Sequence, residues 1–182
     1  MRLFLATDLS EEVREKLTEA VGWMTDFHGP LKVIRPKNYH VTLKFLGSVH
    51  QTNVPAILGA LQKNLRGFIP ARMRLEGWGS FGESGSKIFW AGLEPKNALL
   101  PLAEQIEKIM EDQGFAPNDR PFEGHVTLAR QGSDALPPAF LKRWNTLEPL
   151  FPTEFSADSV TLYESNTTPS GPVYTPQAKI SF

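Results

Sequence analysis

The sequence predicts an α+β fold in which most strands are antiparallel. Three observations support this prediction: helix-like and strand-like segments interleave along the 182 residues, several strand-like segments follow one another without a helix between them, and one strand-like motif occurs twice. The composition is that of an ordinary globular protein, with 41% hydrophobic and 21% charged residues. Because no linker-like stretch divides the chain, we expect a single folded domain over residues 1–182.

Helix and strand signals follow one another in a definite order. Ser10 is placed to cap a first helix, whose apolar residues repeat at helical spacing as far as Met24. Similar apolar stripes predict helices over residues 53–65 and 98–113, the latter followed by Gly114 as a suitable cap, and a short helix over 138–144. A glycine-rich loop is expected over residues 77–82. Strands are expected over residues 2–8, 32–35, 40–46, 71–77, 87–93, 124–130, 155–164 and 173–182.

A nine-residue repeat is the most informative feature of the chain. Residues 35–43 align with residues 120–128 at six identical positions, and the paired residues are 85 apart in sequence. Both copies contain His-Val-Thr-Leu, beginning at His40 and at His125. The six matched residues are of six different types, so biased composition does not explain the match. The repeat therefore predicts two similar lobes, each contributing one such strand.

Alternation along these strands predicts a shared polar site. His40 and Thr42 point to one face of the first strand, and His125 and Thr127 do the same in the second, while the intervening valine and leucine point to the core. If a pseudo-two-fold relates the lobes, the two polar faces line one cleft. Two imidazoles can act as general base and general acid near neutral pH, and two threonine hydroxyls can bind the oxygens of one phosphate. The motif thus indicates acid–base chemistry on a phosphodiester that needs no metal.

These residues give the chain a clear family resemblance. It resembles the RNA 2′,3′-cyclic phosphodiesterase / 2′-5′ RNA ligase family, within the 2H phosphoesterase superfamily, which is named for its two His-x-Thr-x motifs. Five segments carry the similarity, in the expected order and across nearly the whole chain: Arg2-Leu3-Phe4-Leu5-Ala6, His40-Val41-Thr42-Leu43-Lys44-Phe45-Leu46-Gly47, Phe89-Trp90-Ala91-Gly92-Leu93, His125-Val126-Thr127-Leu128-Ala129-Arg130 and Leu162-Tyr163-Glu164-Ser165.

The resemblance implies a fold, an activity and a set of roles. The fold is bilobal, with two pseudo-symmetric lobes of mostly antiparallel sheet, helices outside and a central active-site cleft. The activity is hydrolysis of an RNA-terminal 2′,3′-cyclic phosphate to a 2′-phosphate, with reversible 2′-5′ ligation of RNA ends. His40 and His125 are then catalytic, and Thr42, Thr127 and Arg130 bind the substrate phosphate. In the family the second-motif histidine is often assigned the water, and the first the leaving oxygen.

Four further positions lie close to the two motifs. Strand alternation puts Lys44 on the cleft face with His40 and puts Phe45 in the core, although the family uses an aromatic residue near that point against a base; both are candidate substrate contacts. Arg130 falls on the face opposite to His125 unless a bulge or the strand end intervenes. Gly124 stands where the resemblance predicts proline.

The composition of the chain limits the kinds of partner and cofactor that it is expected to bind. The chain has no cysteine, which excludes disulfides, thiol catalysis and thiolate metal sites, and no apolar run long enough to cross a membrane. A net charge of −1 favours a small local site for RNA ends or short oligonucleotides over a long nucleic-acid track. We expect a cytoplasmic monomer without cofactor or metal. The alternatives are a non-catalytic RNA-end-binding protein of the same fold and a metallo-phosphoesterase, which is disfavoured because neither motif supplies a second metal ligand.

Overall fold

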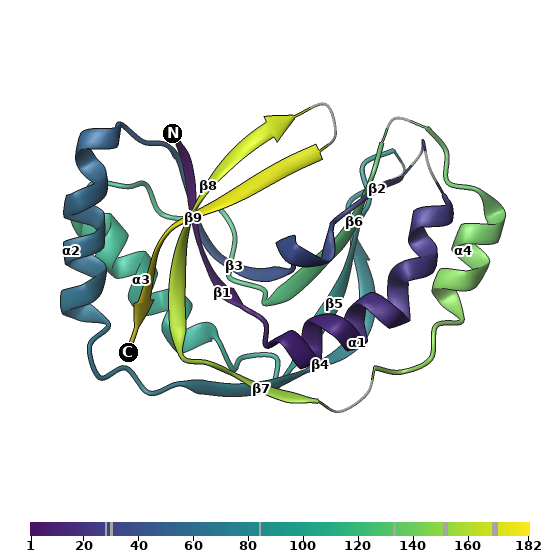
Figure 1. The fold of residues 1–182 in the computed structure, drawn as a ribbon, viewed down its shortest axis with the longest axis horizontal. Coiled ribbons are helices and arrows are strands. Elements are labelled where there is room, and N and C mark those ends of the chain that lie inside the picture. Colours follow the sequence, from purple (N-terminus) through teal and green to yellow (C-terminus); the bar gives the residue numbers. More distant parts are fainter. Residues whose placement is uncertain (28, 30, 84, 133, 151–152, 169–170) are drawn as a thin grey trace.

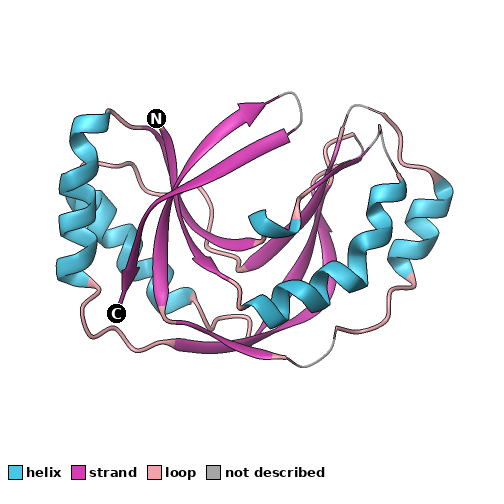
Figure 2. Ribbon diagram, viewed as in Figure 1, coloured by secondary structure: helices cyan, strands magenta, loops and turns pink. Residues whose placement is uncertain are grey.

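The strands form one curved sheet with helices outside it (Figure 1, Figure 2). The structure is a computed structural model that describes the chain apart from residues 28, 30, 84, 133, 151–152 and 169–170. The helices are α1 (Glu11–Val21), α2 (Val54–Asn64), α3 (Leu100–Asp112) and α4 (Pro138–Asn145). The strands are β1 (Arg2–Asp8), β2 (Leu31–Val33), β3 (His40–Ser48), β4 (Ala71–Phe81), β5 (Ile88–Glu94), β6 (His125–Gln131), β7 (Glu154–Ala157), β8 (Ser159–Thr168) and β9 (Gly171–Ser181).

The order of the strands reveals the predicted two-lobed symmetry. It runs β7-β4-β5-β6-β3-β1-β8-β9, with β2 also paired to β6, and the pairs are antiparallel. The two motif strands, β3 and β6, are neighbours at the centre, where Val41 lies opposite Val126. β1 and β5 flank them, followed by β8 and β4. We call β3, β1, β8 and β9 the first lobe, and β6, β5, β4, β7 and β2 the second. The predicted α+β class and bilobal arrangement are confirmed.

The helices cover the outer surface of the sheet in a crossed manner. α3 follows β5 in sequence but packs on β3 beside α2, whereas α1 follows β1 but lies with α4 along the second lobe (Figure 1). Phe140 of α4, for example, packs edge-on against Phe89 of β5, with ring centroids 5.0 Å apart. Ser10 caps α1 as predicted, because its hydroxyl accepts from the amide of Val13 at 3.4 Å. None of the described helices is long and apolar enough to span a membrane. Since each lobe is covered by a helix from the other half of the repeat, the lobes are bound together outside the sheet as well as within it.

Each motif strand carries a bulge directly after its His-Val-Thr segment. In β3, Thr42 lies opposite Ala6 and Lys44 opposite Leu5, so Leu43 is the extra residue. In β6, Thr127 lies opposite Trp90 and Ala129 opposite Phe89, so the extra residue is Leu128, at the equivalent position of the repeat. A bulge shifts the alternation of side chains by one residue. The two residues that follow the extra leucine in each strand therefore lie on the reverse of the predicted faces, and in β3 a second register shift comes directly after them, at Leu46.

Two predicted elements differ in the structure. The expected loop over residues 77–82 is mostly strand, because β4 continues to Phe81; Gly77, with φ +76°, sits in a register shift of this strand that only glycine accommodates readily. The single strand expected over residues 155–164 is two strands separated at Asp158. β7 pairs with β4 in the second lobe, while β8 pairs with β1 in the first. This short connection joins the two lobes, from the edge strand β7 to β8, the strand next to the opposite edge.

Candidate active site

His40 is the first residue of β3 and is held on both sides of its ring. Its Nδ1 lies 2.6 Å from the carbonyl oxygen of Asn38, and its Nε2 lies 3.1 Å from the hydroxyl of Thr42. A carbonyl can only accept, so the proton of the neutral ring is on Nδ1 and the Thr42 hydroxyl donates to Nε2. The rings of Phe4 and Tyr174 pack on the imidazole, with centroids 5.0 and 5.3 Å away. The first motif therefore fixes the orientation of Nε2.

His125 repeats this anchoring in the second lobe. Its Nδ1 lies 2.7 Å from the carbonyl oxygen of Glu123, again two residues earlier in the chain. The same tautomer follows, with Nε2 unprotonated in the neutral ring, and among the described residues this nitrogen has no hydrogen-bond partner. Phe81 meets the imidazole edge-on at 5.0 Å between centroids, and Trp90 lies 6.2 Å away. In both motifs, therefore, Nε2 is the ring nitrogen that carries no proton in the neutral form.

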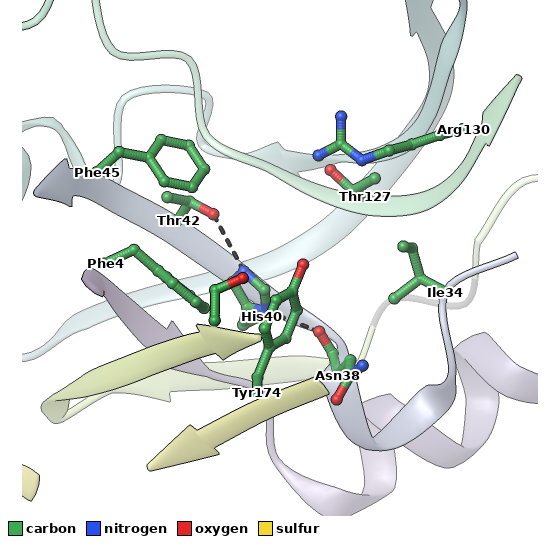
Figure 3. A pocket seen from close by; sticks show the side chains of 10 residues that line it. Phe4, Ile34, Asn38, His40, Thr42, Phe45, Thr127, Arg130 and Tyr174 are labelled. Carbon is green, nitrogen blue, oxygen red and sulfur yellow. Dashed lines mark hydrogen bonds between the residues drawn. The ribbon is translucent and has the colours of Figure 1, made fainter. Parts of the chain in front are cut away.

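A single pocket gathers residues from both motifs (Figure 3). Its walls include His40, Thr42 and Phe45 from β3, and Thr127 and Arg130 from β6. His125 does not line this pocket; it lies on the same face of β6, two residues before Thr127, against the second-lobe aromatic rings. The remaining wall residues are Phe4, Ile34, Asn38, Ser165 and Tyr174. Four of the five predicted catalytic and phosphate-binding residues therefore meet at one pocket, with His125 beside it.

The electrostatics link the two histidines. Burial lowers the pKa of His40 to about 4, although the Asn38 carbonyl and the charge of Asp8 act in the opposite direction, and the charges of His125 and Arg130 lower the pKa further. Burial also lowers the pKa of His125, where Glu123 opposes the shift and Arg130 adds to it. A positively charged Arg130 therefore acts on both imidazoles. An anion bound among these groups would raise both pKa values.

The bulges explain where three of the predicted residues lie. The prediction that Lys44 faces the cleft is wrong: its side chain is 1% exposed and its Nζ donates to Glu107 at 2.6 Å and to the carbonyl of Ala116 at 2.9 Å. The prediction of a core position for Phe45 is also wrong, since Phe45 is 67% exposed and lines the pocket. The bulge considered for Arg130 is present, and the guanidinium lies beside Thr127 in Figure 3.

Several site residues were not identified from the sequence. Tyr174 comes from β9, far from either motif, and no local pattern indicates its place beside His40. Asp8 lies opposite His40 in the register of β1 and β3, and its carboxylate accepts from the hydroxyls of Thr161 at 2.8 Å and Tyr163 at 2.6 Å. The alternation of β1 could have placed Phe4 and Asp8 on one face, but not opposite His40. In the described part of the chain, no group of three or more His, Cys, Asp or Glu side chains is arranged to hold a metal ion.

Comparison with known proteins agrees with the fold and the motifs. The two central motif strands define a phosphoesterase fold with two histidine motifs. The profile of the 2′-5′ RNA ligase superfamily matches residues 10–169, and the chain belongs to this superfamily. A curated RNA 2′,3′-cyclic phosphodiesterase from Thermus thermophilus is 35% identical over 100% of this chain and 90% of its own length. One with the same description from Thermotoga maritima is 29% identical over 96% of this chain and 91% of its own.

Solved structures show the same architecture. The crystal structure of TT0787 of Thermus thermophilus matches with a TM-score of 0.82 and 33% sequence identity, covering 100% of this chain and 97% of that one. The crystal structure of E. coli LigT complexed with 3′-AMP matches with a TM-score of 0.75 and 27% identity, covering 99% and 97% of the two chains. The similarity therefore extends over both lobes and includes both motif strands.

Proposed function

We propose that the protein is an RNA 2′,3′-cyclic 3′-phosphodiesterase, which opens the cyclic phosphate at an RNA end and leaves a 2′-phosphate. The family and the description shared by its curated relatives support this reaction. One observation of the site carries the proposal: the first histidine, both threonines and Arg130 line one pocket, and Arg130 acts electrostatically on His40 and His125 alike. A site that unites two imidazoles, two hydroxyls and a guanidinium suits a phosphodiester anion.

The reaction divides naturally between the two histidines. The Nε2 of His125 takes a proton from water, whose oxygen bonds to phosphorus as the bond from phosphorus to the ribose O3′ breaks. The Nε2 of His40, protonated once the anionic substrate has raised its pKa, gives its proton to O3′. One feature supports this direction: Nε2 of His125 has no hydrogen-bond partner among the described residues, so it is free to accept a proton from water. Each histidine ends with the proton state in which the other began.

The other polar groups would act on the phosphate itself. Thr42 and Thr127 approach the pocket from opposite lobes and donate to the two non-bridging oxygens, and the guanidinium of Arg130 stabilises the negative charge that grows on them. The hydroxyl of Thr42 turns from His40 to the phosphate when substrate binds. A 5′-hydroxyl RNA end in place of water yields a 2′-5′ phosphodiester by the same steps, and their reversal cleaves it. The side chains supply acid, base and charge stabilisation, so we expect no metal requirement.

The test uses a short RNA that ends in a 2′,3′-cyclic phosphate. In excess chelator the wild-type protein should convert it to the 2′-phosphate isomer alone, identified against 2′- and 3′-phosphate standards. His40→Ala and His125→Ala should each lose at least about 10³-fold in kcat, since each removes one partner of the proton relay. His50→Ala, at an exposed histidine outside the site, is the matched control and should keep full activity. Full activity in either motif variant, or a 3′-phosphate product, would contradict the proposal.

A further inference from the structure

Lys32 and Arg130 lie directly opposite each other in the β2–β6 pair. The register runs Leu31 to Gln131, Lys32 to Arg130 and Val33 to Ala129. Directly opposite residues of an antiparallel pair project from the same face of the sheet, and Arg130 lines the pocket, so Lys32 lies on the pocket face as well. Ile34, two residues after Lys32 and just beyond the end of β2, also lines the pocket, as continued alternation of an extended chain predicts. Lys32 does not itself line the pocket, so the two cations stand side by side with Arg130 at the pocket wall and Lys32 next to it on β2.

In the described part of the chain, no carboxylate pairs with either of these like charges. Both residues are exposed, and neither side chain forms an ion pair or hydrogen bond with another described residue. Like charges directly opposite each other destabilise a sheet, so a neutral residue at position 32 would serve the fold better. The whole chain carries a net charge of −1, so the pair is not part of a generally basic surface. An uncompensated local pair of cations is the arrangement expected of a site for an external anion.

The position of Lys32 separates its anion from the reacting phosphate. Arg130 lies beside Thr127, where the reacting phosphate is placed by the proposed function. Lys32 lies on the next strand and, from Ile34 at the pocket wall, roughly 6.8 Å farther along that strand. Position 32 is thus displaced along the chain from the part of the pocket where Thr42 and Thr127 would hold the reacting phosphate. A second anion, one step along the substrate, fits this displacement.

We infer that Lys32 binds the phosphodiester on the 5′ side of the terminal nucleoside, so that the site selects an RNA chain end over a mononucleoside cyclic phosphate. The inference rests on the proposed function and names the substrate class of the same site. Arg130 binds the reacting phosphate and also attracts the adjacent phosphodiester. Lys32 binds only that adjacent phosphodiester. The first phosphodiester of the chain is the nearest further anion that an RNA end offers, whereas a mononucleoside 2′,3′-cyclic phosphate has none.

The test compares three substrates: adenosine 2′,3′-cyclic phosphate, a dinucleotide that ends in the same group, and that dinucleotide with an uncharged methylphosphonate as its internal linkage. Lys32→Gln should lower kcat/KM for the natural dinucleotide about three- to tenfold and leave the mononucleoside within about twofold of wild type. The salt dependence of log(1/KM) for the dinucleotide should become shallower by about 0.7. Lys63→Gln on α2, an exposed lysine away from the pocket, is the control and should change neither substrate.

The methylphosphonate substrate makes the test a double-mutant cycle. The wild type should lose about three- to tenfold on the uncharged linkage, and Lys32→Gln should lose nothing further, because the interaction is already absent. If Lys32→Gln lowers activity on all three substrates equally, or still shows the full methylphosphonate loss, the second-phosphate site is wrong while the proposed function stands. If the wild type opens neither the mononucleoside nor the dinucleotide, the proposed function itself has failed.

Discussion

Phe45 and Arg130 occupy equivalent positions of the two motif strands, 85 residues apart, and line the same pocket. Each lies two residues after the bulged leucine of its strand, Leu43 or Leu128. The repeat thus keeps the histidine, the threonine and the bulge in both lobes, but places an aromatic ring in one and a cation in the other. The groups that would handle phosphate oxygens are nearly symmetric, while the groups that recognise the rest of the substrate are not.

The exposed ring of Phe45 is predicted to support the terminal base. Phe45 is a large apolar side chain that is 67% exposed at the wall of a polar pocket. Such a ring is stabilised when a planar base stacks on it and covers its exposed face. Phe45→Ala should raise KM for cyclic-phosphate substrates about fivefold to a hundredfold, as expected for loss of one stacked base, with a smaller change in kcat. Steady-state kinetics on adenosine and uridine 2′,3′-cyclic phosphates measure this, and the loss should be larger for adenosine.

Ile69 provides the matched control for this substitution. Among the described residues it is the other exposed large hydrophobic side chain, at 83%, and it lies in the chain before β4, outside the pocket. Ile69→Ala should leave both kinetic constants unchanged, and neither variant should lose more than about 0.5 kcal/mol of unfolding free energy, because neither side chain is buried. Unchanged KM in Phe45→Ala would show that the ring does not contact substrate.

The sequence predicted the central strands well because two independent signals coincided there. The period of two placed the histidine and threonine of each motif on one face, and the repeat indicated that these faces belong to related lobes. The same period failed two residues later. A bulge depends on how a strand pairs with its neighbour, so residues 40–46 alone contain no signal for it, and Lys44 and Phe45 were assigned to each other's faces.

Local sequence patterns also do not predict which strands lie next to each other in the sheet. Residues 155–164 read as one strand, yet the chain leaves one lobe at Asp158 and enters the other. Periodicity reports which face of a strand is apolar, not which neighbour it pairs with. Tyr174 and Asp8 reach the first motif through β9 and β1, and only the sheet order brings them there. For Arg130, the family resemblance predicted a place at the phosphate site, whereas a strand pattern without a bulge predicted the opposite face.

The buried ion pair between Lys44 and Glu107 is predicted to be important for stability. Lys44 is 1% exposed, and its ammonium depends on Glu107, which also accepts from the amide and side chain of Asn118. Glu107→Gln leaves the lysine without a counter-charge in a buried position and should lower the free energy of unfolding by about 3 kcal/mol. Urea denaturation measures the loss. The variant tests a link between β3 and the segment that leads into the second motif.

The exposed Arg74–Glu76 ion pair provides a matched control for the Glu107→Gln substitution. The Arg74–Glu76 pair is also 2.6 Å long, but its side chains are 37% and 55% exposed, against 1% and 21% for Lys44 and Glu107. Glu76→Gln should therefore change the free energy of unfolding by less than about 1 kcal/mol, because water and salt screen that pair. Equal losses in the two variants would show that burial does not control the strength of the Lys44–Glu107 pair.

The lowered pKa of His40 predicts a specific loss of stability in acid. Its pKa is about 4 in the folded protein, against 6.5 for an unperturbed histidine, chiefly because the ring is buried. Between these values the unfolded chain binds a proton that the folded protein does not, so the free energy of unfolding falls as pH decreases from above 6.5 towards 4. Lowering the pH from 7 to 5 should remove about 1–2 kcal/mol through this group.

Two variants isolate the contribution of His40. His40→Gln should show a smaller loss of unfolding free energy between pH 7 and pH 5 than the wild type, by about 1–2 kcal/mol, whereas His50→Gln at an exposed position should retain the wild-type dependence. Urea denaturation at the two pH values gives both slopes. Identical slopes in His40→Gln and wild type would mean that His40 keeps an ordinary pKa. It would then be substantially protonated without substrate below pH 6.5, and the bound phosphate would no longer be what charges the proposed acid.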